Sequence, residues 1–180
     1  GFFMPAIQAD ALRAVASDVK NDSQSFFMPT ARIFAAQALS FRQNWLARLL
    51  MKFAIALFSP PHAPASRRAL RFAQAALADG HQIVRLFFYQ DGVHSASSTV
   101  VCAQDELDLP REWREFVQAQ QLDGVVCIAA ALRRGVLNQQ EAERYSRQAA
   151  NLDASWELSG LGQLHEAAQL ADRLVCFGGS

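Results

Sequence analysis

From residue 51 onward, short apolar runs alternate with longer stretches whose apolar residues recur at helical spacing. The apolar runs cover residues 52–58, 83–89, 124–128 and 173–177. Such short, nearly continuous runs are typical of strands buried on both faces. Strands that alternate with helices favour parallel pairing through crossover connections. The sequence therefore predicts an α/β fold, with an open, mainly parallel sheet and helices on both faces.

Capping residues set the expected ends of the helices. We expect Ser66 to cap the first helix and Gly80 to end it, because glycine readily adopts the left-handed conformation found after many helices. Further helices are predicted over 106–120, 139–151 and 159–170, the last capped by Ser159 or entered through the segment SGLG.

Residues 1–50 differ in kind from the rest of the chain. The motif FFMP occurs twice, and an alanine-rich stretch follows each copy. The second stretch favours an amphipathic helix, because its apolar residues recur near helical spacing: Ile33, Phe34, Ala38, Phe41, Trp45 and Leu49. We therefore expect an N-terminal extension over 1–50, helical or disordered, and an α/β domain over 51–180. Met51 resembles a natural start, so an artefact of the start site is the alternative explanation for the extension.

Composition limits the classes of function. Lysine plus arginine number 17 and aspartate plus glutamate number 17, and this balance argues against nucleic acid or an anionic membrane as the main partner. Cys102, Cys127 and Cys176 form no CxxC pair and no Cys/His metal spacing, so we expect neither a metal site nor a disulfide framework. Reduced cysteines and the lack of an apolar run of about 18 residues predict a cytoplasmic protein without a membrane span.

Ligands of open parallel sheets bind beyond the carboxyl ends of the strands. Three predicted loops lie there: SPPHAPAS at 59–66, YQDGVHSASS at 89–98 and AAALRRGV at 129–136. Cys127 lies at the end of the third strand, and Arg133 and Arg134 follow at a loop's length. Because the thiolate is the reactive form of cysteine and nearby guanidinium groups favour it, Cys127 is the candidate catalytic residue and the two arginines its supporting charges. We expect the sulfur of Cys127 to emerge at this edge, whereas Cys176 lacks a similar outlet.

Structural explanations stand beside these chemical ones. A cysteine in a strand is most often a small buried hydrophobic residue. The two arginines could instead form surface ion pairs with Glu141 or Glu143. His62 and His94, on loops at the same edge, could carry protons but are more often only solvated. The sequence contains neither a lysine-bearing phosphate loop nor the Gly-x-Ser-x-Gly turn of a hydrolase.

Five segments resemble, in order, the DsrE/TusD family of sulfurtransferase subunits. They are MKFAIALFSPP, ALRFAQAALADGHQIVRLFFYQDGVHSA, DELDL, VCIAAALRRGV and NLDASWELSGLGQLHEAAQLADRLVCF. The resemblance implies a DsrE-like fold over 51–177 and a sulfur relay in which a cysteine persulfide carries sulfur, with 2-thiolation of the wobble uridine of transfer RNA as the expected pathway. The family's active cysteine lies just before AAALRRG, which corresponds to Cys127 here, with Ile128 between.

The resemblance also implies partners. These are TusC-like and TusB-like chains in a heterohexamer, a TusA-like sulfur donor and a TusE-like acceptor. No metal, organic cofactor, direct contact with nucleic acid or membrane is implied. Two alternatives stay open: a sulfur carrier of dissimilatory sulfur oxidation, or a non-catalytic assembly subunit in which Cys127 is only packed. The extension and the additional Cys102 and Cys176 depart from the family pattern, and the resemblance assigns them no role.

Overall fold

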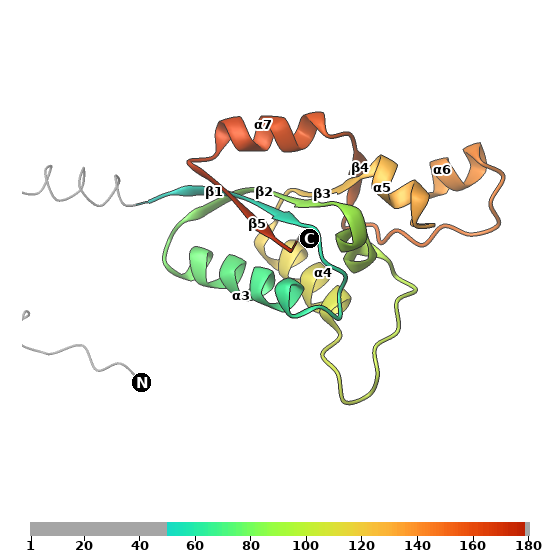
Figure 1. The fold of residues 1–180 in the computed structure, drawn as a ribbon, viewed down its shortest axis with the longest axis horizontal. Coiled ribbons are helices and arrows are strands. Elements are labelled where there is room, and N and C mark those ends of the chain that lie inside the picture. The colour runs from blue at the N-terminus through green and yellow to red at the C-terminus, as the bar shows by residue number, and fades with distance from the viewer. Residues whose placement is uncertain (1–49, 179–180) are drawn as a thin grey trace, which may run out of the picture. The chain divides into compact units, whose positions relative to one another are not determined.

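The computed structural model describes residues 50–178, and its elements are labelled in Figure 1. The predicted amphipathic helix of the N-terminal extension lies outside the described residues. The elements are β1 Lys52–Leu57, α3 Pro64–Ala78, β2 Gln82–Phe88, η2 Gln90–Ala96 (a 3₁₀ helix), α4 Leu109–Gln120, β3 Gly124–Cys127, α5 Ile128–Arg133, α6 Gln139–Arg144, β4 Glu157–Ser159, α7 Gly162–Leu170 and β5 Arg173–Phe177.

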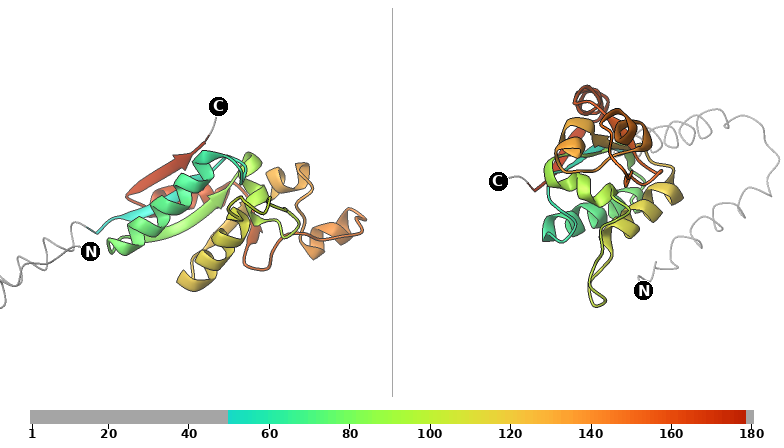
Figure 2. Two further views of the ribbon diagram at one scale, coloured as in Figure 1. Left: turned by 90° about the horizontal axis from the view of Figure 1, so that it is seen from below. Right: turned by 90° about the vertical axis from the view of Figure 1, so that its right-hand side faces the viewer.

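The five strands form one sheet in the order β4-β3-β2-β1-β5, and every neighbouring pair is parallel. The first four strands follow one another across the sheet, after which the chain crosses from β4 at one edge to β5 at the other. Right-handed crossovers place helices on opposite faces when the direction reverses in this way. Accordingly, α3 and α4 cover one face and α7 covers the other (Figure 1, Figure 2). The predicted fold class is confirmed.

The core lies where the central strands meet α3 and α4. Residues 54–57 of β1 are each at most 1% exposed, which explains why this strand is apolar on both faces. Phe88 of β2 packs edge-to-face between Trp113 and Trp156, with ring centroids 5.3 and 4.6 Å away, a favourable aromatic geometry. This packing anchors the end of β2 against α4 and against the segment that precedes β4, and the ends of β2 and β3 carry the candidate site.

Three predicted helix boundaries are wrong for local reasons. Helix α3 begins at Pro64, not after Ser66, because proline suits the first helical position. The Ser66 hydroxyl donates instead to the carbonyl oxygens that precede the helix, at 2.9 and 2.7 Å. Helix α4 begins at Leu109, not at residue 106, because the carboxylate of Asp108 caps it by accepting from the backbone N–H of Arg111. The helix predicted over 139–151 ends at Arg144.

Three segments have a structure that the sequence does not predict. Two predicted loops are helical in part, since η2 follows β2 and α5 follows β3 directly. Ser159 belongs to strand β4 and caps no helix, and α7 begins without a side-chain cap.

The prediction that α3 ends at Gly80 is confirmed, because Gly80 follows the helix with a left-handed φ of 84°. Among the described residues, no helix combines the length and hydropathy needed to cross a bilayer.

Candidate functional site

The ends of β2, β3 and β4 surround an open cavity of about 360 Å³ at the carboxyl edge of the sheet. Its lining comes from the segment after β2, from α5 and from the loop after β4: Tyr89, Gln90, Cys127, Ala129, Ala130, Arg133, Arg134 and Leu161. All three site residues predicted from the sequence therefore line one cavity. This is the edge at which open parallel sheets bind their ligands.

Cys127 is the last residue of β3 and lies immediately before α5, with its backbone still extended. It pairs in register with Ser159 of β4. The expectation that its sulfur emerges at the sheet edge is wrong for the chain alone, because the residue is only 1% exposed. The reason is local: α5 starts at the next residue, and Ala130 and Ala131 pack into the same buried cluster as Cys127. The thiol lies in the wall of the cavity but is shielded from bulk water.

The other two cysteines are more exposed than Cys127. Cys102 is half-buried, and its sulfur lies 4.0 Å from a carboxylate oxygen of Asp108. Cys176 is exposed on the edge strand β5, so the expectation that it lacks an outlet is wrong. Exposure alone therefore does not single out Cys127. What distinguishes Cys127 is its place beside two arginines in a cavity.

The structure separates the roles of the two arginines. Arg134 Nε donates to a carboxylate oxygen of Asp91 at 2.6 Å and thereby ties α5 to η2. This hydrogen bond is the main reason why the pKa of Asp91 lies below its ordinary value, although partial burial opposes the shift. Arg133 is exposed and forms no ion pair within residues 50–178. Arg133 is thus the unneutralised charge at the cavity.

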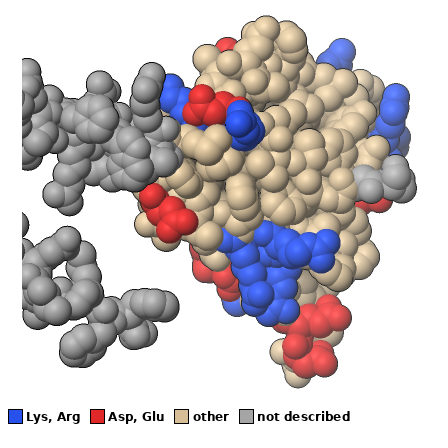
Figure 3. Space-filling model, turned by 60° about the vertical axis from the view of Figure 1, so that its left-hand side comes forward, with Lys and Arg blue, Asp and Glu red and all other residues tan. Residues whose placement is uncertain are grey.

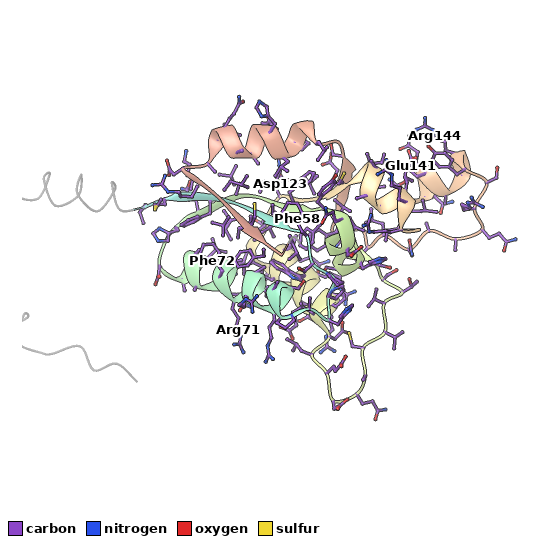
Figure 4. All side chains as sticks on the ribbon, viewed as in Figure 1. Phe58, Arg71, Phe72, Asp123, Glu141 and Arg144 are labelled. Carbon is purple, nitrogen blue, oxygen red and sulfur yellow. The ribbon has the colours of Figure 1, made fainter. Side chains whose placement is uncertain are left out.

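The alternative pairing of these arginines with Glu141 or Glu143 is not found. Glu141 pairs with Arg144 on its own helix, with 3.5 Å between nitrogen and oxygen, and both lie on α6, beyond α5 (Figure 4). The sequence offered no direct sign of the ion pair with Asp91, which depends on how η2 folds against α5. The contribution of Leu161 was also missed, although the segment SGLG marks a turn there.

The two loop histidines lie outside this cavity. His62 and His94 line a neighbouring cavity of about 270 Å³, together with Cys102 and mainly apolar residues. They remain electrostatically close, since both make smaller contributions to the lowered pKa of Asp91. Nowhere in residues 50–178 do three His, Cys, Asp or Glu side chains gather as metal ligands would. The cavity beside Cys127 thus combines one thiol with guanidinium groups, a combination suited to thiol chemistry.

Comparison with known proteins assigns the chain to a family. The family model described as DsrE/DsrF-like matches residues 51–177. The chain belongs to the DsrE/DsrF-like family. A sulfurtransferase TusD homolog of Pseudomonas aeruginosa is 78% identical over 129 residues, covering 72% of this chain and 98% of the relative. The sulfurtransferase TusD of an Enterobacter species is 43% identical over 128 residues, covering 71% of this chain and 100% of that protein.

A further DsrE/DsrF-like relative carries a different name. DsrE of Allochromatium vinosum, proposed as a sulfurtransferase, is 46% identical over 129 residues, covering 71% of this chain and 99% of the relative. Among solved structures, the YchN protein of E. coli superposes with a TM-score of 0.56 at 18% identity. That match covers 72% of this chain and all of YchN, and it supports the fold alone.

Proposed function

We propose that this chain is a sulfurtransferase subunit of a sulfur relay and carries sulfur as a persulfide on Cys127. The observation that carries the proposal is the cavity at the ends of β2, β3 and β4, which has Cys127 in its wall and the unpaired Arg133 in its lining. The names of the TusD relatives, above all the one at 78% identity, support the same activity. Thiolation of transfer RNA in the cytoplasm is the pathway that we infer from these relatives.

Sulfur transfer at Cys127 needs only thiol chemistry. The Cys127 thiolate attacks the terminal sulfur of a donor's persulfide, and the donor's S–S bond breaks as the new S–S bond forms. The donor leaves as a thiolate, and the proton lost by Cys127 passes to solvent. An acceptor thiolate then attacks the terminal sulfur and releases Cys127. No net oxidation or reduction occurs, so the two steps require no other redox reagent.

The charges around the cavity suit a sulfur anion. The guanidinium of Arg134 is already compensated by Asp91, whereas that of Arg133 has no carboxylate partner among the described residues. A free guanidinium favours both the attacking thiolate and the terminal sulfur of a persulfide. Since α5 has only six residues, we attribute this role to the side chain of Arg133 and not to the helix terminus.

Access to the buried thiol requires that part of the cavity lining move. Tyr89 and Leu161 belong to segments that follow strands, and Leu161 is 51% exposed. A partner that binds the exposed side chain of Leu161 would displace this loop and bring its own sulfur to Cys127. We propose a TusA-like donor and a TusE-like acceptor for this step, and TusC-like and TusB-like chains as the other subunits of a heterohexamer.

Replacement of each cysteine tests the function. The assembled complex is incubated with a donor protein loaded with radiolabelled persulfide sulfur, and protein-bound label that a reductant removes is counted. Cys127→Ser should abolish labelling of this subunit, because no other thiol lies in the cavity. Cys102→Ser and Cys176→Ser should retain it, and all three variants should assemble normally. Reductant-removable label on the Cys127→Ser subunit would overturn the proposal.

The burial of Cys127 favours one rival, an assembly subunit of the same fold whose cysteine only packs. In that case Cys127→Ser would leave sulfur flow through the complex unchanged, because another subunit would carry the sulfur. The similarity to DsrE of Allochromatium vinosum leaves sulfur oxidation as a further pathway for the same chemistry. Delivery of label from the complex to an acceptor protein and onward to transfer RNA distinguishes these pathways.

A further inference from the structure

Helix α3 presents three exposed arginines, Arg67, Arg68 and Arg71, at spacings that bring them to one side of the helix. Helix α3 contains no acidic residue. None of the three guanidinium groups forms an ion pair with any of residues 50–178. Figure 4 shows Arg71 projecting from α3 away from the sheet. We call these three residues the arginine face.

The position of the arginine face is unfavourable for the helix itself. Arg67 and Arg68 lie in the first two turns of α3, where the aligned peptide dipoles disfavour positive charge. No acidic residue in the first turn offsets this effect, and no side chain caps the helix. The helix dipole therefore gives Arg67 and Arg68 no stabilising role, and their guanidinium groups, which are unpaired within the described part of the chain, are available for binding.

A groove of about 460 Å³ runs beside the arginine face. Its other wall is the loop between η2 and α4, which contributes Asp105, Glu106 and Leu107. His62 and apolar side chains from residues 61, 63, 64 and 109 complete the lining. Leu107 is 45% exposed. Figure 3 shows one large patch of basic atoms among smaller ones, and a group of acidic atoms lies beside it. The groove is thus a partly apolar channel with positive charge along one wall and negative charge on the other.

The groove shares lining residues with the cavity that holds the two loop histidines. His62 and Leu107 line both the groove and the neighbouring 270 Å³ cavity, and His94 lines that cavity. The two histidines lie close enough to Asp91 to affect its pKa, and Asp91 holds Arg134, which lines the cavity of Cys127. The groove therefore adjoins the 270 Å³ cavity, which lies at the same carboxyl edge of the sheet as the cavity of Cys127.

We propose that the arginine face and its groove bind an acidic segment of the protein that exchanges sulfur with Cys127. Carboxylates of that segment pair with Arg67, Arg68 and Arg71, and an apolar side chain enters the groove beside Leu107. The surface follows from the geometry of α3 and its groove, whereas the identity of the partner as a sulfur donor or acceptor rests on the proposed function.

Two observations favour an acidic protein segment over a nucleic acid. Asp105 and Glu106 lie on the wall opposite the arginines and repel any anionic group that approaches them, so the groove suits a ligand whose negative charge lies on one side only, whereas a phosphate backbone carries charge along its whole length. A sugar-phosphate backbone has no hydrophobic side that could pack against the apolar part of the lining. An amphipathic peptide has such a side. Arginine rather than lysine also suits bidentate pairing with carboxylates.

A direct binding measurement tests the arginine face. The probe is a fluorescent helical peptide of about 18 residues, five turns, with glutamates at i and i+4 on one side and leucines on the other. We expect the unmodified chain to bind it in a salt-dependent manner and Arg67→Glu/Arg71→Glu to weaken binding about tenfold or more, because attraction becomes repulsion. Since acidic residues suit the start of a helix, this variant should melt no earlier than the unmodified chain.

The matched control is Arg147→Glu/Arg173→Glu, which reverses two exposed charges outside the arginine face. Peptide affinity should survive in this control, and an equal loss there would overturn the inference. So would unchanged peptide binding by the arginine-face variant. A labelled RNA oligomer of similar length is the second probe. Tighter binding of RNA than of peptide, lost in the same variant, would replace the proposal with a nucleic-acid surface.

Sulfur transfer separates this inference from the proposed function. The arginine-face variant should raise the KM for the partner protein and leave kcat unchanged, because docking is weakened while the chemistry at Cys127 is intact. Cys127→Ser should bind the peptide normally and transfer no sulfur. If Cys127→Ser still transfers sulfur but the arginine-face variant loses the peptide, the function is wrong and the docking surface stands.

Discussion

At the scale of single residues, the three thiols should differ in their reaction with a neutral alkylating agent. Cys176 is exposed, Cys102 is half-buried and Cys127 is 1% exposed. We predict that iodoacetamide modifies Cys176 first, Cys102 next and Cys127 last in the isolated chain, because attack needs direct access to the sulfur. Mass spectrometry of the tryptic peptides over time gives the three rates.

The urea-denatured chain is the control for this labelling, since unfolding should make the alkylation rates of the three cysteines nearly equal. If Cys127 of the native isolated chain reacts as fast as Cys176, the burial of the thiol does not persist in solution. A rate at Cys127 that rises when partner subunits or a sulfur donor bind would match the proposed displacement of Leu161. The same experiment therefore relates the burial of the thiol to its use.

Sequence reasoning at this scale could place Cys127 and both arginines near one strand end, because strand alternation fixes the edge to which a residue belongs. It could not give the exposure of the thiol, which depends on α5 starting at the next residue. Nor could it assign Asp91 to Arg134, since this pair joins residues 43 positions apart that meet only when η2 packs against α5. Contacts of this kind depend on tertiary structure and leave no local pattern.

At the scale of elements, one arginine holds α7 to the sheet. Arg85 of β2 is 13% exposed at its side chain and donates to Asp123 at 2.6 Å, to Glu166 at 2.8 Å and to the backbone oxygen of Gln163 at 2.9 Å. Burial lowers the pKa of Arg85, but the hydrogen bonds to Glu166 and Asp123 outweigh this and raise it. The charged side chain thus bridges β2, the start of β3 and α7.

We predict that Arg85→Met loosens α7 and lowers the free energy of unfolding by about 1–2 kcal/mol. This is the low part of the range for hydrogen bonds to charged groups, because both carboxylate partners are about half exposed. In hydrogen exchange, the amides of α7 should exchange faster in Arg85→Met than in the unmodified chain, whereas the amides of α3 should exchange at nearly the same rate in both. Arg173→Met, at an exposed position, is the control, and unchanged protection of α7 in Arg85→Met would contradict the prediction.

The elements also show where sequence patterns succeed. The sequence correctly predicts four strands, because each forms an apolar run that is long enough to recognise. Strand β4 has only three residues, including Glu157, and shows no apolar run. The sequence predicts a loop where the short, alanine-rich helix α5 forms, because six residues are too few to show helical periodicity. The predicted start of α3 is wrong because Pro64 occupies the first helical position, while the Ser66 hydroxyl donates to carbonyl oxygens that precede the helix and caps nothing.

At the scale of the whole molecule, the described surface leaves apolar groups uncovered at one edge of the sheet. Strand β5 is an edge strand with Leu174 41% exposed, and Leu170 at the end of α7 is 55% exposed. Parallel strands are usually covered on both faces, so this edge fits the proposed assembly with other subunits. The arginine face lies on the opposite side of the sheet from α7, which leaves it free for a sulfur-exchanging partner.

The last prediction concerns the extent of the folded domain. The buried core of the described residues starts at Ala54 and ends at Ala167. We predict that residues 51–180 expressed alone fold with a free energy of unfolding within about 1 kcal/mol of that of the full chain, as for changes outside a core. Urea unfolding of both proteins, with circular dichroism as the readout, gives the two values. A loss of more than about 3 kcal/mol, the scale of a large side chain removed from a core, would show instead that residues 1–50 are an integral part of the domain.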